Sequence, residues 1–121
     1  MPSTDIILAL DTHLVILITY HRDYPLPDSD TVTVINEARS HIPTGEAVRY
    51  PIPGLLQYTS GNVCLSLSPQ YNPAMYWPEW EATLRGLLWF REQYVALAMA
   101  FSVMDSLHGL AVIGTGMLGF A

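Results

Sequence analysis

The clearest pattern in the chain is a set of apolar residues at three- and four-residue spacing between residues 80 and 95, namely Trp80, Leu84, Leu87, Leu88 and Val95. This spacing places them on one side of a helix, as a stripe that another part of the protein must cover. Pro78 suits the first position of a helix, and Glu79 places negative charge near the positive end of the helix dipole. The pattern therefore predicts a helix over residues 77–94.

Two residues of this predicted helix depart from the stripe. Arg91 falls inside it, either as a side chain whose charged end reaches past the apolar surface into water or as a buried side chain that pairs with an acid. Trp89 falls on the opposite side of the helix. There it is either covered by a neighbouring loop or exposed as part of a surface for a partner.

Other segments alternate with a period of two, which is typical of strands. Residues 14–20 are rich in β-branched side chains, and residues 63–68 alternate apolar with small polar side chains. Residues 95–103 alternate large apolar side chains with alanine and serine. The large side chains would surround a helix but share one face of a strand, so a strand is predicted. A long helix that replaces the strand at residues 95–104 is the alternative, because neither glycine nor proline separates the two patterns near Tyr94.

Two further strands are predicted over residues 47–52 and 110–116. A second helix is predicted by apolar residues at helical spacing before Pro43, namely Val34, Ile35, Ala38 and Ile42. Residues 21–30 contain two prolines and are predicted to be a connector. The resulting order matches a ferredoxin-like βαββαβ arrangement plus a C-terminal strand. We therefore expect one α+β domain over residues 1–121, an antiparallel sheet with two helices on one face.

The segment 1–24 has two interpretations. Its apolar runs are typical of an export leader, but Asp5 and Asp11 flank or interrupt them, and neither a basic start nor a small-residue cleavage site is present. The uninterrupted runs are far shorter than the roughly 20 apolar residues that span a membrane. The segment is therefore either a degraded export leader or an added strand, and no membrane span is expected.

Composition excludes several classes of function. Half of the residues are hydrophobic and 13% are charged, where a soluble domain typically has about 25% charged. Five arginines, no lysine and 11 acidic residues give a formal net charge of −6, which argues against binding nucleic acid through its phosphates. The absence of lysine also excludes a Schiff base and a P-loop. The single cysteine, Cys64, cannot form an intrachain disulfide.

Three motifs lie mainly in the C-terminal half: Tyr58-Thr59-Ser60-Gly61-Asn62-Val63, then Tyr76-Trp77-x-x-Trp80-x-x-Thr83-Leu84-Arg85-Gly86-Leu87, and finally Ile113-Gly114-Thr115-Gly116-Met117-Leu118. In these motifs the chain resembles a lineage of small uncharacterised fungal proteins, many of them secreted. The motifs are structural in character. The resemblance therefore implies secretion but brings no activity with it.

The C-terminal glycines have the G-x-G-x-x-G spacing of a dinucleotide site, at Gly114, Gly116 and Gly119. Such a site also needs a helix after the glycines and an acidic residue about 20 residues later. The sequence offers neither after residue 119, so no cofactor is expected. We interpret the glycines as part of a tail or of a kinked edge strand.

Four polar residues are weak candidates for a metal site: Asp11, His13, His21 and Asp23. They form two Asp–His pairs at i,i+2 spacing, which on an extended backbone places each pair on one side. Mixed histidine and carboxylate ligands suit zinc or another divalent metal. The same residues are equally typical of turns and strand ends.

Two other arrangements are weaker still. A Ser-His-Asp triad could be assembled around His41 or His108. Cys64, on a predicted strand, is expected to be a small buried residue rather than a nucleophile.

The expected function is a non-enzymatic binding or self-associating α+β protein, as a homo-oligomer or with a protein partner. The alternative is a small metal- or His/carboxylate-dependent enzyme, which would require the four metal candidates to converge in a concave site. The expected partner surface consists of Trp89 or of the sheet face without helices, which is lined by Ala96, Ala98 and Ala100.

Overall fold

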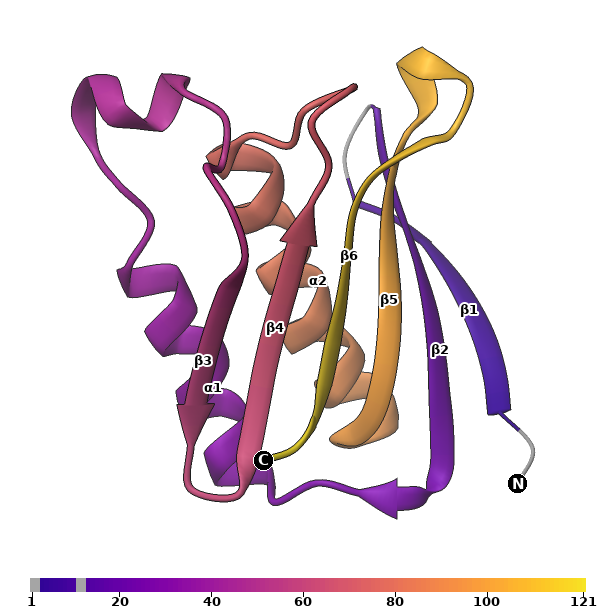
Figure 1. The fold of residues 1–121 in the computed structure, drawn as a ribbon. Coiled ribbons are helices and arrows are strands. Elements are labelled where there is room, and N and C mark those ends of the chain that lie inside the picture. The colour runs from indigo at the N-terminus through magenta and orange to yellow at the C-terminus, as the bar shows by residue number, and fades with distance from the viewer. Residues whose placement is uncertain (1–2, 11–12) are drawn as a thin grey trace.

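A computed structural model describes residues 3–10 and 13–121, with the side chains of residues 3, 4 and 22 left aside. A six-stranded antiparallel sheet carries two helices on one face (Figure 1). The elements in chain order are β1 (Ser3–Ala9), β2 (Leu14–Pro25), α1 (Asp28–Ser40), the 3-10 helix η1 (Gly45–Arg49), β3 (Leu56–Ser60), β4 (Val63–Pro69), α2 (Trp77–Tyr94), β5 (Leu97–Asp105), the 3-10 helix η2 (Ser106–His108) and β6 (Ala111–Phe120). The predicted α+β class is confirmed.

The strand order across the sheet is β1-β2-β5-β6-β4-β3, and every neighbouring pair is antiparallel. The ferredoxin-like arrangement is not confirmed. In that topology β2 and β4, the strands before the two helices, would be neighbours, but here the hairpin of β5 and β6 lies between them. The C-terminal strand is therefore a central strand of the sheet rather than an addition at its edge.

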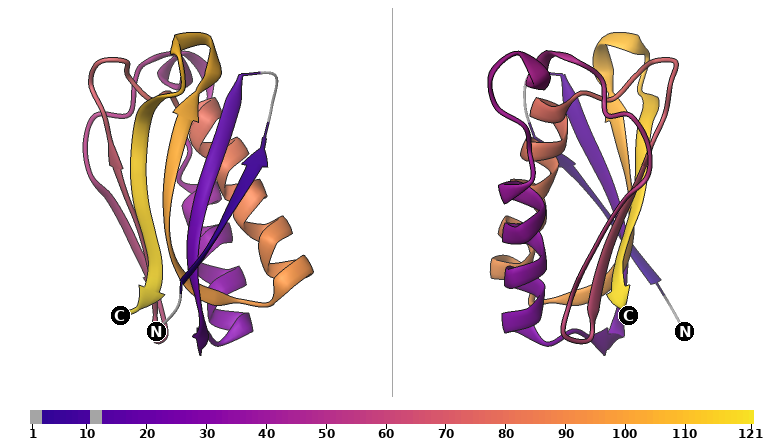
Figure 2. Two further views of the ribbon diagram at one scale, coloured as in Figure 1. Left: turned by 90° about the vertical axis from the view of Figure 1, so that its right-hand side faces the viewer. Right: turned by 60° about the vertical axis from the view of Figure 1, so that its left-hand side comes forward.

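The core lies between the sheet and the helix layer (Figure 2). Alternate residues of the strands point into it, and Ile18, Phe101 and Leu67 are each at most 2% exposed. On α2 the buried side chains are Trp80, Thr83, Leu84, Leu87 and Phe90 together with two small residues. Each large apolar side chain that is fully buried contributes about 1.5–3 kcal/mol relative to an exposed one. Three residues of the predicted stripe, Trp80, Leu84 and Leu87, thus hold the two layers together, whereas Leu88 is half-buried and Val95 lies after the helix and is exposed.

The two ends of α2 are fixed in different ways. At the start, the backbone N–H of Tyr76 donates to a carboxylate oxygen of Glu79 at 2.8 Å. Near the end, Nε of Arg91 donates to Asp28 in the first turn of α1 at 2.9 Å, and the Arg91 side chain is only 23% exposed. Of the two interpretations of Arg91, pairing with an acid is the observed one, because the start of α1 brings Asp28 against it at the surface, where the Asp28 side chain is 62% exposed.

The chain passes from α2 into β5 through Val95, so the alternative of one long helix does not hold. Val95 adopts φ 81° and ψ 166°, a backbone region that is almost restricted to glycine. Its side chain is 60% exposed. A bend without glycine or proline is therefore made at the cost of local backbone strain.

One sequence prediction fails between the helices. Residues 47–52 are not a strand: η1 occupies the first three of them, and Pro51 forms only an isolated bridge. The strand lies further on, as β3 at Leu56–Ser60. Gly61 and Asn62 form the turn that separates β3 from β4. Gly61 has φ 57°, which favours glycine.

The N-terminal segment belongs to the sheet. β1 pairs with β2 over its whole length, from Ser3 to Ala9. β2 also runs to Pro25, through a part of the chain predicted to be a connector. Among the described residues, no helix combines the length and apolar character needed to cross a membrane.

Candidate functional site

The face of the sheet that points away from both helices is the largest feature without a covering layer (Figure 2). Strand register shows which residues share it. One row of neighbours crosses all six strands as Asp5, Thr19, Ala100, Met117, Ser66 and Gln57. Two parallel rows complete the surface, Ile7-Leu17-Ser102-Thr115-Ser68 and Ala9-Val15-Met104-Val112. We call these residues, together with Ala98, Cys64 and Thr59 of the same alternation, the open face.

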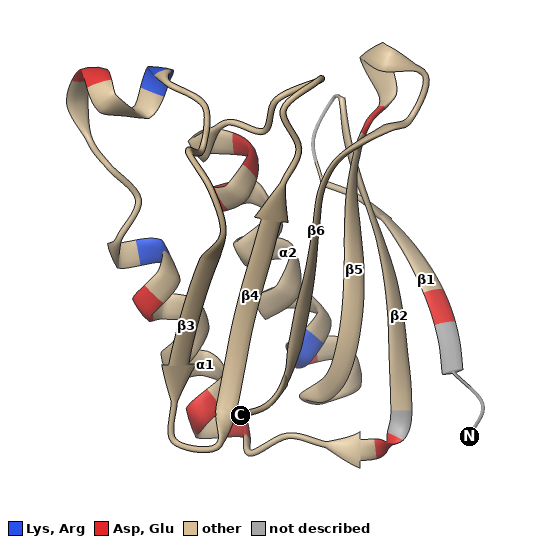
Figure 3. Cartoon of the chain, in the orientation of Figure 1, with Lys and Arg blue, Asp and Glu red and all other residues tan. Residues whose placement is uncertain are grey.

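The open face is apolar at one side and polar at the other. Around β1 and β2 it carries exposed or half-buried aliphatic residues, including Ile7 at 68% exposure and Leu17. Towards β4 and β3 it carries hydroxyl and amide groups such as Ser66 and Gln57. Asp5 is the one charged residue in the set just defined. Figure 3, drawn from the open side, shows acidic and basic residues on the helices and at strand ends instead.

The expected partner residues divide between two places. Ala98 and Ala100 lie on the open face, where Ala100 is exposed. Ala96 does not: it is only 4% exposed, and its carbonyl accepts a hydrogen bond from the Leu26 N–H at 2.9 Å. Its inclusion was wrong because the strand begins one residue later, at Leu97.

Trp89 lies on the helix side of the molecule, with 44% of its surface exposed. It borders a hollow of about 300 Å³ between α2 and the end of β1, lined by Leu8, Ala9, Leu10, Ala82, Arg85, Gly86 and Trp89. Of the two interpretations of Trp89, exposure is the observed one. It borders a surface on the helix side that shares Ala9 with the open face.

The four metal candidates do not form one site. His13 lies directly before β2, whereas His21 lies eight residues further along the same extended chain, about 26 Å away at the rise of a strand. Asp23 is exposed near the far end of β2, and Asp11 lies outside the described residues. The part of the chain that the structure describes holds no group of three or more histidine, cysteine or acidic residues able to bind a metal.

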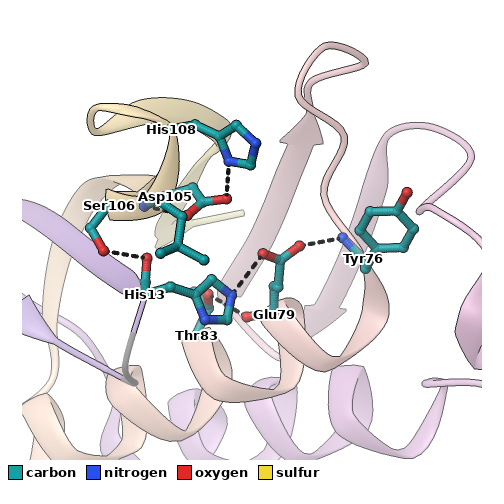
Figure 4. A network of polar contacts seen from close by, with 8 residues as sticks. His13, Tyr76, Glu79, Thr83, Asp105, Ser106 and His108 are labelled. Carbon is teal, nitrogen blue, oxygen red and sulfur yellow. Dashed lines mark hydrogen bonds and ion pairs between the residues drawn. The ribbon is translucent and has the colours of Figure 1, made fainter.

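His13 belongs instead to a polar network at the end of the sheet where β5 finishes (Figure 4). Its Nε2 lies 3.4 Å from a carboxylate oxygen of Glu79, whose other oxygen caps α2. Its carbonyl accepts from both the N–H and the hydroxyl of Ser106, at 2.8 and 3.2 Å. The network thus ties the β1–β2 connection to the start of α2 and to η2.

Asp105 is the most buried acid of this network. It accepts from the Leu107 N–H at 2.9 Å and from Nδ1 of His108 at 2.7 Å. Burial raises the pKa of the Asp105 carboxyl, but these two hydrogen bonds and the charges of His108 and His13 together outweigh burial and lower it. Asp105 is therefore held ionised as an acceptor for the turn between β5 and β6.

This network does not assemble a Ser-His-Asp triad. The Ser106 hydroxyl donates to the His13 carbonyl rather than to His108, and His108 is largely exposed. His41 is engaged elsewhere, with its ring stacked on Tyr58 at 5.5 Å and its Nδ1 2.9 Å from the Glu37 carbonyl. The arrangement can position a turn and the start of a helix. None of its residues lines the hollow beside Trp89.

The three glycines of the G-x-G-x-x-G spacing lie inside β6, away from any helix start. A side chain at Gly116 would collide with the Phe101 ring and the Ser66 carbonyl, and one at Gly114 would meet the Met75 sulfur at 2.7 Å. Gly114 and Gly116 make room for core side chains, whereas a side chain at Gly119 would meet no atom within 4 Å. The prediction of an edge strand was wrong, because β6 lies in the middle of the sheet. The role of the glycines in β6 is structural.

Sequence reasoning missed two features of these surfaces. Cys64 is half-buried on the open face, with the Gln57 side-chain amide 3.6 Å from its sulfur, rather than buried in the core. The hollow beside Trp89 was also missed, since it depends on β1 lying next to α2. The small side chains of Ala82 and Gly86 on the Trp89 side of α2 were the one local signal for it.

Comparisons of the chain with protein-family models, with curated proteins and with solved structures gave no match. Function is therefore inferred from the geometry of this chain itself.

Proposed function

We propose that this chain is a non-enzymatic protein-binding module that associates with a second copy of itself through the open face. The observation that carries the proposal is a sheet face without a covering layer and with one charged residue, Asp5, among those that define it. Antiparallel sheets often have one face exposed to water, but the residues that point to such a face are usually polar or charged. This face instead carries aliphatic side chains on its β1 and β2 half.

The distribution of charge favours association of two copies through their open faces over association through their helix surfaces. Each chain has a formal net charge of −6, so two copies repel when their charged surfaces approach. Packed sheets and their helix layers are spaced about 10 Å apart. Contact through the open faces would put the two helix layers about 30 Å apart, well beyond the screening length of about 8 Å at physiological salt.

The size of the open face suits a dimer that uses most of it. Six strands about 4.8 Å apart, with about seven residues each at 3.3 Å per residue, outline roughly 24 by 23 Å. This gives about 550 Å² before side chains roughen the surface. A standard interface buries about 800 Å² per partner in accessible area, so the two are of similar size.

The pattern of the open face also selects an orientation. A two-fold axis running across the strands would set the apolar half of one copy against the apolar half of the other, with Leu17 near Leu17 of the second copy. Asp5 would then lie far from its counterpart, because the axis reverses the strand direction. The small side chains of Ala100 and Ser102 allow the sheets to approach closely.

Light scattering across a hundredfold dilution of the whole chain tests self-association. The expected result is a mass of twice the 13.5 kDa chain at high concentration that falls towards 13.5 kDa on dilution. Added salt should leave the association unchanged or strengthen it, because an apolar contact is not screened. A mass of 13.5 kDa at every concentration contradicts the proposal, and so does an association that salt abolishes.

A further inference from the structure

The outer edge of β1 is a second surface that the proposed dimer does not use. β1 pairs with β2 alone, so every second residue along its outer side leaves a backbone N–H and C=O without a strand partner. Natural edge strands are usually shortened, bulged or protected by lysine or proline. β1 is seven residues long, has no lysine or proline, and pairs with β2 without a bulge; its one charged residue, Asp5, accepts a hydrogen bond from the Thr19 hydroxyl of β2. The opposite edge, β3, has five residues.

The hollow beside Trp89 continues from this edge. Leu8, Ala9 and Leu10 form its β1 side, while Ala82, Gly86 and Trp89 form its α2 side. Gly86 allows this contact, because a side chain there would collide with Leu10. A strand added outside β1 would direct alternate side chains towards this hollow.

Arg85 gives the hollow a positive charge. Its side chain is 63% exposed, and its nearest acid, Glu81, is 3.9 Å away and also exposed. An exposed pair at that distance contributes little, so Arg85 remains free to bind a carboxylate from a partner. Apart from backbone atoms and the indole N–H of Trp89, the remaining lining is apolar.

We propose that the edge of β1 binds an extended acidic peptide as an additional strand. One large apolar side chain of the peptide fills the hollow against Trp89, and an acidic residue two positions away, on the same side, meets Arg85. Backbone hydrogen bonds to β1 supply affinity, and the hollow supplies selectivity, as in other strand-addition interfaces.

A synthetic peptide tests the inference on the whole chain. The probe alternates threonine with apolar residues and carries one phenylalanine followed two positions later by aspartate. Its control is the same peptide with alternate backbone amides methylated, which removes strand pairing but keeps the side chains. Binding is followed by NMR at a protein concentration where light scattering gives a monomer.

The expected result is saturable binding of the probe, with shifts concentrated at β1 amides and the Trp89 indole, and no binding of the methylated control. Trp89→Ala should weaken binding about tenfold or more, since buried aromatic anchors dominate such interfaces. Arg85→Gln should weaken it several-fold at low salt and flatten its salt dependence. Met117→Ala, on the open face, should leave it unchanged.

Equal binding of the two peptides, shifts confined to the open face or to the surface around Tyr94, or no saturable binding would overturn the inference. Because Arg85→Gln changes only an exposed side chain, it keeps the test valid if Trp89→Ala fails to fold. None of these results depends on whether the open faces associate.

Discussion

The two faces of the sheet are formed by alternate residues of the same strands, yet they differ in side-chain character and in whether another layer covers them. Across the core face, one row of neighbours is Ile6, Ile18, Phe101, Gly116, Leu67 and Leu56. The next row, on the open face, is Asp5, Thr19, Ala100, Met117, Ser66 and Gln57. The first row packs large side chains under the helices. The second has mostly uncharged side chains, only some of them apolar, and no layer above it.

This difference shows which features of the sheet folding requires: the composition of the buried face, but not that of the open face. A buried face must be apolar and tightly filled, so its composition follows from packing. A face in water is free to carry charges, as the helices do here. The scarcity of charge on the open face is therefore not explained by the fold, and it is the reason to assign that face a partner.

The largest expected effect lies in the layer that covers the core face. Leu84→Ala and Leu87→Ala, both at 0% exposure, should each lower the free energy of unfolding by about 2–5 kcal/mol. Met117→Ala, 62% exposed on the open face, should change it by less than about 0.5 kcal/mol in the monomer. Denaturant unfolding at low protein concentration measures all three. Equal effects would remove the distinction between the two faces.

The glycines of β6 allow the same comparison within one strand. Gly116→Ala places a methyl group against Phe101 and the Ser66 carbonyl, and overpacking of this kind costs about 1–3 kcal/mol. Gly119→Ala meets no atom within 4 Å, so its stability should stay within about 0.5 kcal/mol of wild type or rise slightly. Thermal unfolding of the pair measures the difference. A tolerated Gly116→Ala would mean that the core face is less tightly filled than described.

Asp105 lies at the end of the sheet, at the turn between β5 and β6, and its ionisation is expected to stabilise the protein. Its pKa is lowered in the folded protein, so its stabilising effect is present above the ordinary carboxyl value of 3.8 and is lost as pH falls through the lowered value. Asp105→Asn should therefore cost about 1 kcal/mol at pH 7, with the gap to wild type closing at low pH. Unfolding curves recorded from pH 7 to pH 2 test this. A gap that does not depend on pH would show that ionisation of Asp105 has no role in stability.

Val95 carries the chain from the helix layer into the sheet and so fixes which side chains of β5 face the core. Because its φ of 81° suits glycine, Val95→Gly should stabilise the protein by up to about 1 kcal/mol. Val32→Gly, inside α1, should destabilise it by about 0.5 kcal/mol instead. Loss of stability in both variants would mean that the Val95 backbone is not strained.

Local patterns in the sequence predicted the elements whose residues carry a strong period. The start of α2 followed from Pro78 and Glu79, and β5 followed from the alternation of large and small residues around Phe101. The segment at residues 47–52 failed because a short apolar stretch between prolines does not reveal whether a neighbouring strand exists to pair with it. In this protein its first three residues belong to η1, and only Ile52 at its end is buried.

The arrangement of elements was beyond local patterns. The position of the β5–β6 hairpin between β2 and β4 depends on contacts between residues far apart in sequence. The open face was partly predictable, because Ala98 and Ala100 alternate with buried residues. The Trp89 hollow was not, since it exists only where β1 and α2 meet. The same long-range placement separated His13 from His21 and joined His13 to Glu79.

The most direct test of the open face as a docking surface is a pair of charge substitutions measured by sedimentation. Ala100→Arg places a charge in the middle of that face, whereas Asn36→Arg places the same charge on the exposed surface of α1. We expect wild type and Asn36→Arg to associate alike, and Ala100→Arg to remain at 13.5 kDa at concentrations where the others are dimeric. Equal association of all three proteins, with Ala100→Arg folded, would contradict the assignment of this face to a second copy.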